Sequence, residues 1–280
     1  MPINTGPFSK KWEDLTFSDN FIFCKVMENE KICRQMLEIL LDIKVEKIEY
    51  IDTEHTEDPF YETRGIRLDV YVKGSTEVYD VEMQNADYAD LPLRARYYQS
   101  ASDISTTPRR TKFKELKKTY IIFICKNDPF GAQLPLYTVK SIIPQAPEIS
   151  YDDKSFKIFY NSSAWSKVEN RELQAVLKYI YENIPTTDFT QNIEENVGVA
   201  KAKPVFKDDY MYFCDIVEDE KEKALAEGIE KGLAEGIEQG LSEGAKNNAI
   251  KNARNFKAKN IDLTVIAECT GLTLEEVANL

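Results

Sequence analysis

Residues 66–84 read IRLDVYVKGSTEVYDVEMQ, and this stretch decides the fold. Its two halves, 66–73 and 77–84, are short, alternate in polarity and are rich in β-branched and aromatic residues, a pattern typical of strands. Gly74 and Ser75 between them favour a tight turn. The stretch therefore predicts a β-hairpin.

The hairpin places two carboxylates on neighbouring strands. Side chains alternate between the faces of a strand, which yields two same-face sets: Arg67, Asp69 and Tyr71 on the first strand, and Asp80, Glu82 and Gln84 on the second. Same-face neighbours on paired strands lie about 4.5–5.5 Å apart between Cβ atoms. Asp69 and Glu82 can then both reach a Mg²⁺ ion, which keeps water in its other positions. The spacing alone fits the solvated face of an ordinary hairpin equally well.

The composition restricts the available chemistry. The only histidine is His55, in the acidic loop DTEHTEDP. Zinc sites built on several histidines are therefore excluded, and a serine or cysteine nucleophile has one histidine to pair with. Five scattered cysteines without a Cys-x-x-Cys pair indicate reduced cytosolic thiols. Carboxylates with a hard metal ion are the chemistry that is left.

Composition and hydropathy indicate a globular protein of the cytoplasm. The 280 residues are 42% hydrophobic and 11% aromatic, enough for one sizeable core with an appendage. No window is apolar enough for a membrane helix. The N-terminal sequence MPINTGPFSKKWEDL lacks the apolar segment of a signal peptide. We therefore expect a cytoplasmic protein without a membrane partner.

The rest of the chain fits the α/β class. Helical spacing predicts two helices within 15–44, with a break around Glu28–Glu30. The other expected elements are a strand in 44–54 that ends in the acidic loop around Pro59, a helix that opens at Pro92, an apolar central strand over 119–126, further strands within 132–160, and a helix over 169–184.

A basic stretch follows the hairpin. Residues 94–118 hold eight Lys or Arg against Asp103 and Glu115, on a chain of net charge −12. Such a stretch can contact phosphates with little sequence specificity, or it can be an ordinary solvated loop. The expected nucleic-acid-binding residues are Arg96, Arg109, Arg110, Lys112, Lys114, Lys117 and Lys118.

Several motifs together carry a family resemblance. GIRLDVYVK, YDVEMQN, LPLRARYYQS and ELKKTYIIFI follow one another, with DLTFSDNFIFCKVM before them and a glycine repeat after them. In this combination the chain resembles the Rpn family of recombination-promoting nucleases and putative transposases, within the broad PD-(D/E)XK nuclease group. The resemblance implies a restriction-endonuclease-like core, with a mixed central sheet flanked by helices and followed by a helical C-terminal tail.

The same resemblance implies an activity. It implies a Mg²⁺-dependent (or Mn²⁺-dependent) DNA endonuclease of low sequence specificity, linked to recombination, transposition or phage defence. Asp69 and Glu82 would be its metal ligands, and Gln84 would stand where the broad group has a lysine. The alternative is a non-catalytic DNA-binding or assembly module on a nuclease fold.

Three residues around this site have open roles. Gln84 can orient a water or phosphate by hydrogen bonds but supplies no positive charge. Arg94, at the start of the next helix, is the candidate for the cationic role; the other interpretation is a surface arginine paired with Asp87 or Asp90. Asp19 is a possible third acidic residue, or the N-cap of the first helix.

The C-terminal region differs in composition from the rest. Asp215–Glu243 holds ten acidic and three basic residues, and glycine recurs every four positions from Gly228 to Gly244. Each glycine costs about 1 kcal/mol in a helix interior, so packing must compensate. We expect a self-associating helix that makes the protein a homo-oligomer; the alternative is a flexible acidic tether.

The expected domains are a nuclease domain over 1–214, the acidic glycine-repeat helix over 215–250 and a small helix-turn-helix-like segment over 251–280. In the last segment Gly271 ends one helix, and Thr273 with Glu276 forms a capping box for the next. Because Glu276 and its neighbour Glu275 would head the recognition helix, the charge favours protein contact over DNA contact there.

Overall fold

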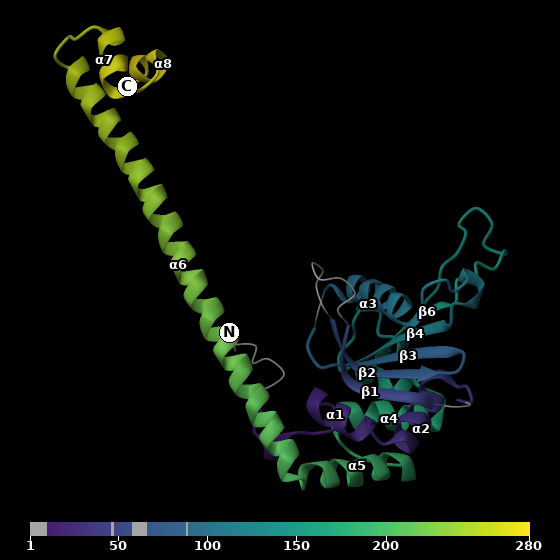
Figure 1. The fold of residues 1–280 in the computed structure, drawn as a ribbon. Helices are drawn as coiled ribbons and strands as arrows, with labels where there is room; N and C mark the ends of the chain where they lie inside the picture. The colour runs from purple at the N-terminus through teal and green to yellow at the C-terminus, as the bar shows by residue number, and fades with distance from the viewer. Residues whose placement is uncertain (1–9, 46–47, 58–65, 88) are drawn as a thin grey trace. The chain divides into compact units, whose positions relative to one another are not determined.

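The computed structural model describes residues 10–45, 48–57, 66–87 and 89–280. The chain divides after Tyr212 into two compact units. The first unit is built on a mixed sheet (Figure 1). The second is made of helices. Each unit is described by itself below.

The sheet confirms the predicted fold class. Its strands, as far as the chain is described, are β1 (Ile48–Glu57), β2 (Ile66–Gly74), β3 (Glu77–Gln84), β4 (Lys118–Cys125), β5 (Leu136–Val139) and β6 (Ser155–Asn161). Their order is β1-β2-β3-β4-β6-β5. The β1, β2 and β3 strands are antiparallel, β3, β4 and β6 run parallel, and β5 is antiparallel to β6.

Helices cover both faces of this sheet. On one face lies α3 (Leu91–Thr106), and on the other lie α1 (Asn20–Met27), α2 (Glu30–Leu41) and α4 (Arg171–Glu182), with α5 (Asp188–Lys201) beyond them (Figure 1). Short 3₁₀ turns are η1 (Trp12–Asp14), η2 (Phe113–Glu115) and η3 (Ser162–Lys167). The expected break between the first two helices is present, because Asn29 caps α2 by accepting a hydrogen bond from the backbone N–H of Lys31 at 3.1 Å.

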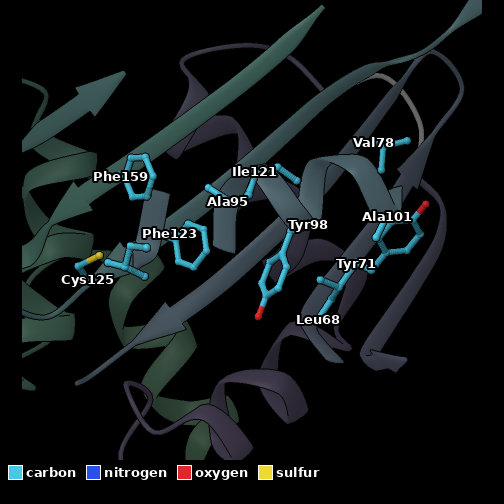
Figure 2. Packing of buried hydrophobic residues seen from close by; sticks show 11 residues of the cluster. Leu68, Tyr71, Val78, Ala95, Tyr98, Ala101, Ile121, Phe123, Cys125 and Phe159 are labelled. Carbon is cyan, nitrogen blue, oxygen red and sulfur yellow. The ribbon is translucent and has the colours of Figure 1, made fainter. Parts of the chain in front are cut away.

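Packing under α3 buries the hairpin on both faces. Figure 2 shows Ala95 and Tyr98 of α3 over Phe123 and Ile121 of β4, with Phe159 of β6 beside them. Full burial of an aromatic side chain such as Phe123 or Phe159 contributes about 1.5–3 kcal/mol. The opposite side chains of the hairpin strands are buried under α1 as well. The sheet therefore has no solvated face at β3.

One sequence expectation for the strands is confirmed and another needs correction. The further strands expected within 132–160 are β5 and β6, and the segment between them holds turns around Pro144 and Pro147, which cannot donate to a strand ladder. The acidic segment with His55 is not a loop up to Glu57, because β1 continues through it and His55 pairs with Leu68 of β2. Pro59 lies outside the described residues.

The second unit consists mainly of one long helix from Phe213 onward. This helix, α6 (Pro204–Lys257), is followed by α7 (Leu263–Thr270) and α8 (Leu274–Ala278). Ala253, Ile266 and Val277 form a small core at their junction. As expected, Gly271 ends α7 in the left-handed conformation, with φ +72°, and Thr273 and Glu276 form the capping box of α8.

The glycine repeat lies on an open surface of α6. A Cβ atom added at any glycine from Gly228 to Gly244 would meet no atom within 4 Å in the described part of the chain. The interleaved apolar side chains are 55–70% exposed: Ile229, Leu233, Ile237 and Leu241. Long as α6 is, neither it nor another described helix is apolar over enough of its length to span a membrane.

Candidate active site

The hairpin register joins Asp69 and Glu82 directly. Val70 pairs with Val81 and Tyr71 with Asp80, so Asp69 and Glu82 face each other on neighbouring strands. The backbone N–H of Asp69 donates to Glu82 Oε1 at 3.0 Å, and the backbone N–H of Met83 donates to Asp69 Oδ2 at 2.9 Å. Each carboxylate is thus fixed by the backbone of the opposite strand.

Helix α3 adds a cation to the two carboxylates. It begins seven residues after β3 with Pro92 in its first turn, a position that suits proline. From this turn Arg94 Nη1 donates to Gln84 Oε1 at 2.8 Å, and Nη2 lies 3.6 Å from Glu82 Oε2. The guanidinium is therefore directed into the site, and its side chain stays about a quarter exposed (26%).

Tyr98 holds this guanidinium in place. One turn after Arg94, its hydroxyl accepts a hydrogen bond from Arg94 Nη2 at 3.0 Å. The Arg94 Cζ atom lies 5.5 Å from the Tyr98 ring centre and 5.6 Å from that of Phe123, within the range of cation–π attraction. Burial, followed by the charge of Glu82, raises the pKa of Tyr98 to about 12. The phenol therefore stays neutral at physiological pH.

A third carboxylate lies inside the same face. Asp80 is fully buried, and neither of its carboxylate oxygens has a hydrogen-bond partner among the described residues. Burial and then the charge of Asp69 raise the pKa of Asp80 well above its ordinary range. Burial, Asp69 and Asp80, in that order, raise the pKa of Glu82, against the opposing effect of Arg94. The site thus concentrates more negative charge than one arginine balances.

The donor set fits a hard divalent ion held mainly by water and two carboxylates. Asp69 and Glu82 offer oxygen ligands on one face of the hairpin, and Mg²⁺ is commonly bound through one or two carboxylates with several waters. Among the described residues, no group of three or more His, Cys, Asp or Glu side chains is arranged so that it could hold a metal ion, so this site offers a pair. Burial and the neighbouring carboxylates raise the pKa values of Asp80 and Glu82, and a cation there would favour their ionised forms.

A shallow hollow opens beside these residues. It encloses about 320 Å³ at the carboxyl ends of β3 and β4, where Gln84, Leu91 and Cys125 form part of its lining. Asn127 and Asp87 also line it, and the Asn127 amide donates a hydrogen bond to Asp87 Oδ1 at 3.1 Å. Gln84 is thus the residue of the site that borders on this hollow.

Asp19 is held by hydrogen bonds at the start of the first unit. It stands at the N-cap position of α1, but its side chain makes no capping hydrogen bond to that helix. Lys10 Nζ donates to its Oδ1 at 2.7 Å, and the backbone N–H and hydroxyl of Thr16 donate to its Oδ2 at 2.8 and 3.0 Å. Both oxygens therefore hold the N-terminal turn.

The part of the basic stretch that follows α3 is not brought next to the carboxylates. Strand β4 is parallel to β3, and Lys118 at its start pairs with Glu77 at the start of β3. Glu82 lies five residues further along β3, which corresponds to about 16 Å at 3.3 Å per residue. Lys117 Nζ donates to the Gly74 backbone oxygen at 2.6 Å, next to the hairpin turn. These cations are close to Glu82 in sequence, but the fold places them farther from it than the sequence suggested.

The expected nucleic-acid-binding residues fall into two places. Arg96 is exposed on α3, two residues after Arg94. The others gather at the hairpin end of the sheet, exposed except for the half-buried Lys117: Arg109, Arg110, Lys112, Lys114, Lys117 and Lys118.

Sequence reasoning gave no role to Asp80 or Tyr98. The available signals were the position of Asp80 two residues before Glu82 on one strand face, and that of Tyr98 four residues after Arg94 on one helix face.

Comparison with known proteins gives one match. The family model described as PD-(D/E)XK nuclease family transposase matches residues 13–138. The matched segment contains the hairpin, α3 and the basic stretch. Searches of the curated proteins and of the solved structures found no match.

Proposed function

We propose that this chain is a Mg²⁺-dependent DNA endonuclease of low sequence specificity, because residues 13–138 match the family model of the PD-(D/E)XK nuclease family transposases, a family of nuclease- and transposase-related function. The observation that carries the proposal is the hydrogen-bonded pair of Asp69 and Glu82 with the guanidinium of Arg94 directed at it.

In this proposal the residues of the chain have distinct tasks. Asp69 and Glu82, whose carboxylates are fixed by the opposite strand, would hold the ion. When bound, Mg²⁺ would supply an activated water and offset the charge of the scissile phosphate. Arg94 provides the positive charge that Gln84 lacks, and its hydrogen bond fixes the Gln84 amide so that the amide N–H₂ and O point in defined directions.

Low sequence specificity follows from the kind of contact available. The exposed cations at the hairpin end of the sheet contact phosphates and read no base edges. Lys118, the last of them, pairs with Glu77, and the run of about 16 Å along β3 from there to Glu82 corresponds to about five base pairs of duplex at 3.4 Å each. A duplex at the carboxylates can therefore reach these cations along its own backbone.

Plasmid nicking tests the proposal. Wild-type protein should convert supercoiled DNA to the nicked form with Mg²⁺ and not with EDTA. Asp69→Asn and Glu82→Gln, which preserve side-chain shape, should each lower the rate by at least about 100-fold. Asp152→Asn, at an exposed carboxylate of the 141–154 loop, is the matched control and should nick at the wild-type rate.

Two results would reject the catalytic role. One is equal nicking by wild type and both site variants, which would indicate a contaminant. The other is DNA binding without any nicking by wild type under Mg²⁺ or Mn²⁺, which would support the non-catalytic DNA-binding module instead.

A further inference from the structure

One aromatic side chain stands in solvent in the middle of the basic stretch. Phe113 is 88% exposed, the largest exposed fraction of any large apolar side chain in the described residues. Leaving a phenylalanine in water forgoes about 1.5–3 kcal/mol of burial. Packing within the first unit therefore gives no reason for an aromatic ring at this position.

The ring is presented by a tethered turn. In η2 the backbone N–H of Glu115 donates to the Lys112 oxygen at 2.8 Å, and that of Leu116 donates to the Phe113 oxygen at 3.1 Å. Lys154 Nζ from outside the turn donates to the Leu116 oxygen at 3.0 Å. The backbone that carries Phe113 is thus held from two sides, while its side chain projects away from the protein.

Charge surrounds the ring. Lys112 and Lys114 flank Phe113 in sequence and are exposed, and residues 107–118 hold six Lys or Arg and one Glu on a chain of net charge −12. An apolar protein partner would bury these cations with the ring, which is unfavourable without matching anions. A DNA duplex would match the cations but would offer only stacked, inward-facing bases to the ring. A single strand offers phosphates to the cations and an accessible base face to the ring.

We propose that the turn around Phe113 binds single-stranded DNA, with an unpaired base stacked on the Phe113 ring and the flanking phosphates on Lys112 and Lys114. That the polyanion is DNA rests on the proposed function. The turn precedes Lys118, which pairs with Glu77 at the hairpin end of the sheet, about 16 Å along β3 from Glu82. It therefore favours substrates that expose a single strand, such as a flap or a branch, next to the cleaved phosphate.

Binding without cleavage provides the test. Full-length protein in EDTA is titrated into fluorescein-labelled oligothymidylate of about 20 nucleotides, and into a duplex of the same length, with anisotropy as the readout. Phe113→Ala should weaken single-strand binding by about 5- to 100-fold and duplex binding by less than about 2-fold. Phe113→Trp, which keeps a stacking ring, should bind as wild type does. Ile142→Ala, at an apolar side chain that is 66% exposed elsewhere, is the control.

Substituting the two lysines should change binding in a different way from substituting the Phe113 ring. Replacing Lys112 and Lys114 together with alanine should weaken both ligands and lower the slope of log Kd against log salt by about 1–2. Phe113→Leu should behave like Phe113→Ala, since stacking needs a ring.

The outcomes separate this inference from the nuclease proposal. Equal loss of single-strand and duplex binding in Phe113→Ala, or no loss in either, would overturn the stacking role. Single-strand binding by Phe113→Leu as tight as that of wild type would also overturn it. The same holds if the wild-type protein binds anionic phosphatidylserine vesicles but does not bind the oligonucleotide. Absence of nicking would leave the binding result intact, because no metal is present in the titration.

Discussion

Arg94 is the residue whose replacement tests the site most directly. It joins Gln84, Tyr98 and Glu82 through one guanidinium. Arg94→Met keeps an unbranched, flexible side chain but removes the guanidinium, and with it the charge, all donors and the Cζ contact with the Phe123 ring. The Glu82 carboxylate, whose side chain is only 4% exposed, would then lose its nearest cation.

The geometry sets the magnitude. Unit charges 3.6 Å apart attract by about 4–5 kcal/mol at an effective dielectric constant of about 20. The remaining exposure of Arg94 weakens this attraction, and removing one partner leaves the other charge buried. We expect Arg94→Met to lower the free energy of unfolding of the first unit by about 2–4 kcal/mol. Arg94→Lys keeps the charge without the planar fork and should lose about half as much.

The effect should depend on pH in a defined direction. The attraction exists only while Glu82 is ionised, and burial raises the pKa of Glu82 in the folded state. Arg94 counteracts that rise, so its removal raises the pKa of Glu82 further. The stability difference between wild type and Arg94→Met should therefore be largest above the pKa of Glu82 in the folded variant, and should shrink as the pH falls from that value to the lower pKa of Glu82 in the folded wild type.

Denaturant unfolding followed by tryptophan fluorescence measures this difference. Both tryptophans, Trp12 and Trp165, lie in the first unit, so the signal reports on that unit. Leu93→Ala, at the neighbouring exposed position of α3, is the control and should shift stability by less than about 0.5 kcal/mol. A difference below about 0.5 kcal/mol for Arg94→Met, or one that stays constant from acid to neutral pH, would refute the reasoning.

Two further perturbations address the buried acid and the glycine repeat. Asp80→Asn should stabilise the first unit by about 1–3 kcal/mol at neutral pH. The pKa of Asp80 is raised in the folded state, so wild type loses stability as the pH rises above the pKa that Asp80 has in the unfolded chain. A gain in stability that does not grow with pH in denaturant unfolding would contradict this. Gly236→Ala should add about 1 kcal/mol to helix α6 taken alone, but it should lower the mass found by light scattering if α6 self-associates through its glycines. If Gly236→Ala keeps a mass larger than that of one chain and equal to that of wild type, the chains associate through another surface. Gln239→Ala, on the same helix, is the control and should keep the wild-type mass.

Local pattern was sufficient for the hairpin and for the pairing of its carboxylates. Alternation along each strand and the short turn determine which side chains of β2 and β3 face each other, and both are properties of neighbouring residues. Whether that face is solvated is a different question. The burial of Asp80 depends on Ile121, its partner on β4, and on α3 above it, both from later in the chain. Pattern within the hairpin cannot distinguish a solvated carboxylate from a buried one.

The position of the basic stretch depends on how α3 connects two parallel strands. Consecutive parallel strands require a crossover that returns the chain to the end where the first strand began. The 16 residues of α3 span about 24 Å, close to the length of about 26 Å of the eight-residue β3. The start of α3 therefore holds Arg94 at the carboxylates, and the chain after its end lies beside the hairpin turn. The apolar sequence of β4 is typical of a central parallel strand. If β4 is taken as parallel to β3, the lengths of α3 and β3 predict that Phe113 and its neighbouring cations lie at the opposite end of β3 from Glu82.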